Sequence, residues 1–243
     1  MTTRGADRVR IYRMPADRLL RALADHSVDL LLTDPPYTSV ARHPGSGHLR
    51  AWFRGGLDWA AIGRVLALGR RKLKADGVVL VMTNAAGLHD AIGALQRAGF
   101  SEVRPITWDR RYPGLGGGLR HQTEFVLLGR LPGSRSLSGV DLVAVAAVGP
   151  GTAHRYPTQK PDGLGRILAK MAGVRPGHLV VDPFCGSGAL LVGPYERGAT
   201  VVGGDIAAAA VAQATRRLRP AVQRRSPGPA RAAATVGPRR RRP

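Results

Sequence analysis

A carboxylate, two prolines and an aromatic ring follow a short apolar run near the start of this chain. Residues 28–37 read Val-Asp-Leu-Leu-Leu-Thr-Asp-Pro-Pro-Tyr. The leucine run is too short for a helix core and the prolines have no N–H to donate to a β-ladder, so a buried strand is predicted to end by Asp34. Proline also disfavours the helical conformation in the residue before it, which leaves the Asp34 carboxylate and the Pro35 carbonyl extended and free to point outward.

This arrangement suits the binding of a planar group that carries an NH2. The carboxylate of Asp34 and the carbonyl of Pro35 would accept its two N–H protons, which aims the nitrogen lone pair at an electrophile. The ring of Tyr37 would stack on the bound group. An ordinary proline turn at a strand end is the alternative interpretation, because such turns are common.

A second loop has the composition of a nucleoside site. Residues 179–188 read Leu-Val-Val-Asp-Pro-Phe-Cys-Gly-Ser-Gly, which predicts a strand that turns through glycines into a helix. Asp205 ends the next predicted strand, where its carboxylate could hold both hydroxyls of a ribose. The sequence 186–188 is too short for a dinucleotide fingerprint and lacks a phosphate-loop lysine, so a nucleoside with little phosphate fits better.

Strands and helices alternate along most of the chain, which is typical of a doubly wound α/β sheet. No helix separates 103–108 from 125–128, so these two strands must form an antiparallel hairpin at the sheet edge. The helix that starts at Trp59 is expected to be broken at Gly77. The predicted strands are 9–12, 28–34, 78–82, 103–108, 125–128, 179–182 and 200–205, and the predicted helices are 17–23, 59–72, 88–98 and 164–171.

Composition narrows the class of protein and of partner. The 243 residues suffice for one sizeable α/β domain, and the net charge of +21 indicates a polyanionic partner, nucleic acid ahead of an anionic membrane surface. No apolar run has membrane-spanning length and the N-terminus lacks a signal-peptide core, so a soluble, intracellular protein is expected. Cys185 is the only cysteine, which excludes a disulfide framework and a zinc site of several thiolates.

Basic loops and a basic tail account for much of this charge. We predict a single domain over 1–219 and a disordered arginine-rich tail over 220–243; removing the seven arginines of that tail from +21 leaves +14. The segments 38–56 and 110–120 are interpreted either as solvated surface loops or as contacts to phosphates. The segment 131–155 looks inserted, and together with 38–56 it is a candidate for target recognition.

Three motifs in a fixed order carry a family resemblance. They are Thr33 to Tyr37, Pro157-Thr158-Gln159-Lys160-Pro161, and Asp182 to Gly188. The chain resembles the amino-DNA methyltransferases over residues 9 to 218, in the circularly permuted motif order of the beta group, and Glu124 with its neighbours Gln122-Thr123 also matches the family. The resemblance implies a Rossmann-like S-adenosylmethionine-dependent methyltransferase fold with a mixed, mostly parallel seven-stranded sheet.

The same resemblance implies the roles of individual residues. The catalytic set would bind the amino group of a base flipped out of the duplex, and methyl transfer from S-adenosyl-L-methionine would need no metal. The implied catalytic residues are Asp34, Pro35, Pro36 and Tyr37. The implied cofactor-binding residues are Thr158, Gln159, Lys160, Pro161, Asp182, Pro183, Phe184, Cys185, Gly186, Ser187, Gly188, Asp205 and Ile206.

The expected function is methylation of adenine N6 in double-stranded DNA, favoured over cytosine N4 because family members that act on cytosine more often carry serine at the position of Asp34. A non-catalytic DNA-binding protein is kept as an alternative because the chain departs from the family at two places. Met14-Pro15 stands where the family often has Gly-Asp, and Pro194 is expected to kink a helix at a cost of ~3 kcal/mol. The resemblance further implies a cytoplasmic protein of bacterial or phage origin, and allows a homodimer and a cognate restriction endonuclease.

Overall fold

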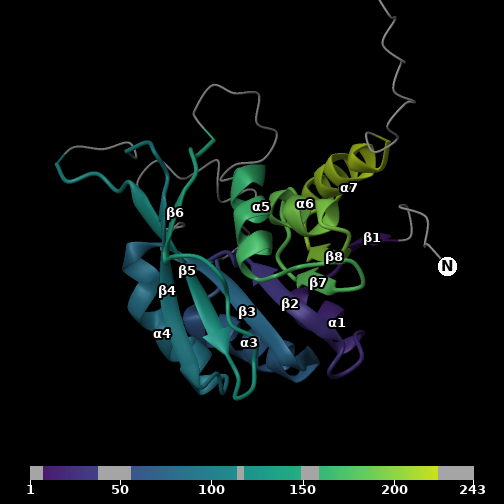
Figure 1. Ribbon diagram of the computed structural model, residues 1–243, viewed down its shortest axis with the longest axis horizontal. Helices are drawn as coiled ribbons and strands as arrows, with labels where there is room; N and C mark the ends of the chain where they lie inside the picture. Colours follow the sequence, from purple (N-terminus) through teal and green to yellow (C-terminus); the bar gives the residue numbers. More distant parts are fainter. Residues whose placement is uncertain (1–7, 38–55, 114–117, 149–158, 224–243) are drawn as a thin grey trace, which may run out of the picture.

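The computed structural model describes residues 8–37, 56–113, 118–148 and 159–223, with the backbone alone over 219–223. These residues form one mixed β-sheet between two layers of helices (Figure 1). The strand order is β1-β8-β7-β2-β3-β5-β4-β6. The strands are β1 (Val9–Arg13), β2 (Val28–Thr33), β3 (Leu73–Thr83), β4 (Glu102–Asp109), β5 (Thr123–Arg130), β6 (Leu142–Ala144), β7 (Leu179–Asp182) and β8 (Thr200–Asp205).

The Rossmann-like fold and its antiparallel hairpin are confirmed, with one correction to the strand number. β5 runs antiparallel to both β3 and β4, as the missing crossover helix predicts. The described residues hold eight strands and not seven, because Leu142–Ala144 pairs in parallel with Thr107–Asp109 of β4. The outermost strand on that side is therefore β6. The hairpin strand β4 lies next to it, and the antiparallel strand β5 lies between β4 and β3.

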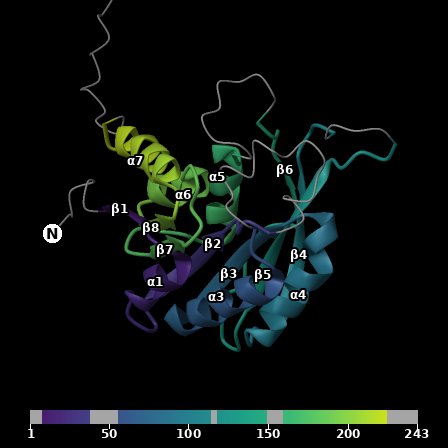
Figure 2. The same ribbon diagram turned by 180° about the vertical axis from the view of Figure 1, so that it is seen from behind.

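The helices divide between the two faces of the sheet, as Figures 1 and 2 show from opposite sides. On β2 the side chains alternate: Leu30 and Leu32 pack with α5, α6 and α7, and Leu31 packs with α1, α3 and α4. This period of two explains why a run of consecutive leucines forms a central strand buried on both faces. The helices are α1 (Ala16–Arg21), α3 (Trp59–Lys72), α4 (Leu88–Arg97), α5 (Asp162–Met171), α6 (Ala189–Glu196) and α7 (Ala208–Gln223).

Two boundaries differ from the sequence prediction. Helix α3 ends at Lys72, as predicted, but β3 starts at Leu73 and not at Val78, with Gly77 inside the strand. The Lys72 ammonium bonds to the Leu23 carbonyl and to Asp25, which ties the helix end to the α1–β2 loop. Helix α7 continues to Gln223, beyond the predicted start of the tail, and residues 224–243 lie outside the described part of the chain.

Helix α6 accommodates Pro194 without a break. The helix is continuous over Ala189–Glu196, with Pro194 two residues before its end, so the proline removes one hydrogen bond near a terminus and not in a long interior. The helix also lies very close to α5, since a Cβ on Gly193 would come within 2.4 Å of the Gly165 carbonyl oxygen. The helix is therefore continuous through Pro194, and glycine is needed where the two helices meet.

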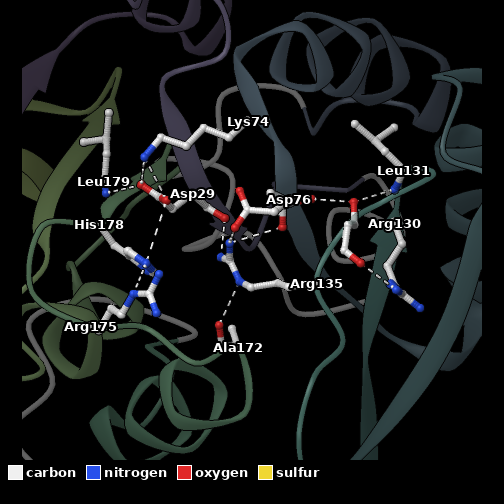
Figure 3. Close-up of polar contacts among 12 residues, drawn as sticks. Asp29, Lys74, Asp76, Arg130, Leu131, Arg135, Ala172, Arg175, His178 and Leu179 are labelled. Atoms are coloured by element: carbon white, nitrogen blue, oxygen red, sulfur yellow. Dashed lines mark hydrogen bonds and ion pairs between the residues drawn. The ribbon is translucent and has the colours of Figure 1, made fainter.

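A network of charged side chains fixes the amino ends of the central strands, at the opposite end of β2 from Asp34 (Figure 3). Asp29 is 3% exposed and accepts hydrogen bonds from the Lys74 ammonium at 2.9 Å and from the Leu179 amide at 2.8 Å. Its backbone carbonyl accepts from Arg135, which also bonds to the carbonyls of Asp76 and Ala172. Arg135 thus anchors the segment that leads to β6 against the sheet.

None of the helices in the described parts of the chain combines the length and the apolar character that crossing a membrane requires.

Candidate active site

Strand pairing brings the two predicted loops together. β2 and β7 are parallel neighbours, with Leu30 beside Val180 and Leu31 beside Val181, so their carboxyl ends reach the same edge of the sheet. At that edge the Thr33 hydroxyl donates to the Asp182 carboxylate at 2.7 Å, although 149 positions separate the two residues in the chain. Open α/β sheets bind ligands at such carboxyl ends.

A cavity of about 450 Å³ opens at this edge and is shared by both loops. Asp34 and Pro36 line it from the first motif, and Pro183 and Phe184 line it from the second. The end of β8 contributes Asp205 and Ile206, the turn between β1 and α1 contributes Met14 and Pro15, and the first turn of α1 contributes Asp17. The position where the chain departs from the family's Gly-Asp is therefore part of the cavity wall.

The Asp34 carboxylate is engaged by a lysine, contrary to the expectation that it is free. The Lys160 ammonium lies 2.8 Å from Asp34 Oδ2 and 3.4 Å from Glu124 Oε2. Burial raises the pKa of Asp34, and the nearby ammonium opposes that rise. Burial acts to lower the pKa of Lys160, but the two carboxylates outweigh it and the pKa is raised, so the lysine is charged at neutral pH.

The Pro35 carbonyl is also partly used, because the turn closes on itself. The Tyr37 amide donates to the Pro35 carbonyl at 2.9 Å, and the Leu57 amide donates to the Pro36 carbonyl at 2.7 Å. The sequence did not predict these bonds, because Leu57 is separated from Pro36 in the chain by the segment 38–55. A carbonyl oxygen has two lone pairs, so this bond uses only one of those on Pro35.

Tyr37 is buried against an aromatic partner. Its side chain is 5% exposed and its ring stacks on Trp59 at the start of α3, with centroids 5.8 Å apart and 14° between the planes. Burial raises the pKa of the Tyr37 phenol, which is therefore neutral. Trp59 was not among the predicted site residues, and its position at a helix start carries no sequence signal for that role.

The glycine-rich loop is held by two carboxylates. Gly186 and Gly188 adopt positive φ angles of 47° and 77°, which glycine adopts most readily. The Gly186 amide donates to Asp205 Oδ2 at 3.1 Å, and the Phe184 amide donates to Asp182 Oδ1 at 3.1 Å. Burial raises the pKa of Asp182 to about 7, against the opposing effect of its hydrogen bonds, and burial likewise raises the pKa of Asp205.

The remaining predicted residues lie around this centre. The Gln159 side chain accepts from Gln213 of α7, and Pro161 immediately precedes α5. Cys185 is a buried thiol whose pKa is raised by burial, and the Ser187 carbonyl accepts from Arg217. Thr158 lies outside the described residues, as do 38–55, 114–117 and 149–155 of the predicted DNA-contacting segments.

Comparison with known proteins points to one class of enzyme. The family model of UPF0020, described as an RMKL-like methyltransferase domain, matches residues 156–194. The type II methyltransferase M2.LlaDCHI of Lactococcus lactis subsp. cremoris is 25% identical over 221 residues, which covers 77% of this chain and 81% of that protein.

Solved structures give the same answer for the fold. The structure of M1.HpyAVI with S-adenosylmethionine has a TM-score of 0.63 at 17% identity and covers 86% of this chain and 99% of that one. The resemblance to the amino-DNA methyltransferases is confirmed. The PvuII DNA methyltransferase, which is specific for cytosine N4, has a TM-score of 0.64 at 14% identity and covers 89% and 92% of the two chains. The comparisons support a DNA methyltransferase and do not distinguish an adenine target from a cytosine target.

Proposed function

We propose that this protein transfers a methyl group from S-adenosyl-L-methionine to the N6 amino group of adenine in double-stranded DNA. The observation that carries the proposal is the shared cavity, because the Asp34 carboxylate lines it together with Pro183, Phe184 and Asp205. The carboxylate that would accept a hydrogen bond from an amino group and the loop that would bind a nucleoside thus line the same cavity. Such proximity is the main requirement of a direct group transfer.

The cavity walls fit the cofactor. Asp205 would accept hydrogen bonds from the two ribose hydroxyls. Ile206, which is 56% exposed, and Phe184 would contact the adenine ring. The positive φ angles of Gly186 and Gly188 turn the loop into α6, and Gly188 lies so close to α7 that a Cβ on it would come within 3.0 Å of Ala214. The bound cofactor supplies an electrophilic methyl group on a sulfonium.

The other wall would bind the target base. Asp34 and the remaining lone pair of the Pro35 carbonyl would accept the two N–H protons of the exocyclic amine, which orients its lone pair toward the cavity. Tyr37 stacks on Trp59 and is 5% exposed, so its ring would receive a base taken out of the duplex only if the turn opens. The positive charge of the whole chain supports DNA as the substrate.

The reaction product tests the proposal directly. Duplex DNA is incubated with the purified protein and methyl-labelled S-adenosylmethionine and then digested to nucleosides. We expect label in N6-methyladenine. Label in N4-methylcytosine would give the same class of enzyme with the other target, and the absence of label in either nucleoside, with the cofactor bound, would favour a non-catalytic DNA-binding protein.

Removal of the Asp205 carboxylate tests the cofactor site. We expect Asp205→Ala to weaken S-adenosylmethionine binding by roughly 100-fold, since it removes two charge-assisted hydrogen bonds to the ribose. Isothermal titration calorimetry measures the affinity. Asp17→Ala is the matched control, because Asp17 lines the same cavity but is 56% exposed and pairs with Arg21 at 4.0 Å. Equal losses in the two variants would contradict the assignment of Asp205.

A further inference from the structure

Charged side chains extend from Asp34 in a row of alternating sign. Lys160, before α5, lies 2.8 Å from Asp34 Oδ2 and 3.4 Å from Glu124 Oε2. Glu124 of β5 in turn has its Oε1 3.5 Å from Arg110, the residue after β4. The side chains of Lys160 and Glu124 are only 11% and 16% exposed, so little water reaches the middle of this row.

One acceptor in the row has unused capacity. Glu124 Oε2 is buried and has no hydrogen-bond partner among the described residues; its contact with Lys160 has the geometry of an ion pair and not of a hydrogen bond. Arg110 approaches the other oxygen, Oε1, which leaves Oε2 to Lys160. Since buried acceptors are normally satisfied, Oε2 marks a second position that the Lys160 ammonium can reach.

In the proposed reaction, Lys160 and the target base compete for the Asp34 carboxylate. The ammonium of Lys160 and the amino group of a base are both donors, and both require the Asp34 carboxylate. The ammonium occupies Oδ2, so an amino group that binds to this oxygen displaces the lysine from it. A lysine that left for water would expose a buried row of charges, whereas a shift toward Glu124 keeps the ammonium paired.

We propose that Lys160 is a positioning residue with two seats: it pairs with Asp34 before the base enters, and it moves onto Glu124 Oε2 when the amino group of the base takes its place. This inference rests on the proposed function. Lys160 favours the ionised form of Asp34 and orients its carboxylate in the empty site, and Glu124, held by Arg110, accepts the lysine so that Asp34 becomes available. Neither Lys160 nor Glu124 needs to touch the cofactor.

The first test measures the second seat without any activity. Chemical denaturation of Lys160→Met, Glu124→Gln and the double variant gives the coupling between the two residues. The cycle is repeated in an Asp34→Asn background, in which the first seat is weakened. We expect the coupling to increase in that background. An unchanged or smaller coupling would overturn the inference, even if the protein proves to be inactive on DNA.

The second test uses turnover of the full chain on duplex DNA. We expect Glu124→Gln to lower kcat by roughly 10- to 100-fold, with the affinity for S-adenosylmethionine and the KM for DNA within about threefold of wild type. Adding Glu124→Gln to Lys160→Met should change kcat no further, because Glu124 acts through the lysine. A Glu124→Gln variant with wild-type kcat, or additive losses in the double variant, would overturn the two-seat proposal. Failure of wild type to methylate DNA would instead contradict the proposed function.

A pH profile separates the two residues. Asp34 is faced by Lys160, Glu124, Tyr37 and Asp182, and burial already raises its pKa. Loss of the ammonium in Lys160→Met removes the main opposing charge, so a protonated Asp34 would limit the reaction and the rate should rise with pH. In Glu124→Gln the ammonium stays on Asp34, so the rate should not recover as pH rises. Parallel profiles for the two variants would count against the proposal.

Discussion

Asp34→Asn is expected to lower the methylation rate by about 10³-fold, which is the range found when one preorganised polar contact to a reacting group is removed. The amide has one acceptor oxygen and no charge, so it cannot orient the amino group as the carboxylate does. The substitution is nearly isosteric, and the 450 Å³ cavity should keep its shape. The measurement is transfer of labelled methyl groups to duplex DNA at saturating cofactor.

Two controls make this result specific to Asp34. The affinity of Asp34→Asn for S-adenosylmethionine should stay within a few-fold of wild type, because the glycine-rich loop is held by Asp182 and Asp205. Asp76→Asn, at the opposite end of the sheet and 55% exposed, should leave the rate unchanged. An Asp34→Asn enzyme that retains a tenth or more of wild-type activity would refute the assigned role.

Asp29→Ala is expected to lower the free energy of unfolding by about 3 kcal/mol, because it breaks a buried charged network and leaves its donors unpaired. The Asp29 carboxylate accepts from Lys74 and from the Leu179 amide, and so connects β2 to both neighbouring strands. Lys74 is 40% exposed and can be rehydrated, which keeps the loss at the lower end of the range for buried pairs. Urea denaturation followed by circular dichroism gives the value.

Asp76→Ala is the matched control for this substitution. Its carboxylate makes a single 3.5 Å contact with Arg135 and is 55% exposed, so a loss of no more than about 1 kcal/mol is expected. Comparable losses in the two variants would show that the buried network does not stabilise the central strands more than an exposed ion pair does.

The two-seat lysine depends on a contact that the sequence alone could not indicate. Lys160 was expected to bind the cofactor as part of its motif, and Glu124 was identified only as part of a family pattern. Their pairing arises because the start of α5 and the start of β5 both reach the edge of the sheet where β2 ends. The sequence around a charged residue does not indicate which distant residue it will pair with in the tertiary structure.

The sequence by itself determined the local elements of this protein and the chemistry at their ends. Proline ends β2 at the aspartate, glycine shapes the loop after β7, and alternation of apolar residues identifies the central strands, because each of these effects acts over a few neighbouring residues.

Only the tertiary structure decided which of these elements meet. It paired β2 with β7 and so joined Thr33 to Asp182; it engaged Asp34 with Lys160, closed the turn at Pro35, and turned part of an expected insertion into the strand β6. The physical reason is that strand pairing and burial act between residues far apart in the chain. A three-residue strand such as Leu142–Ala144 has no stability of its own and exists because β4 offers it a partner.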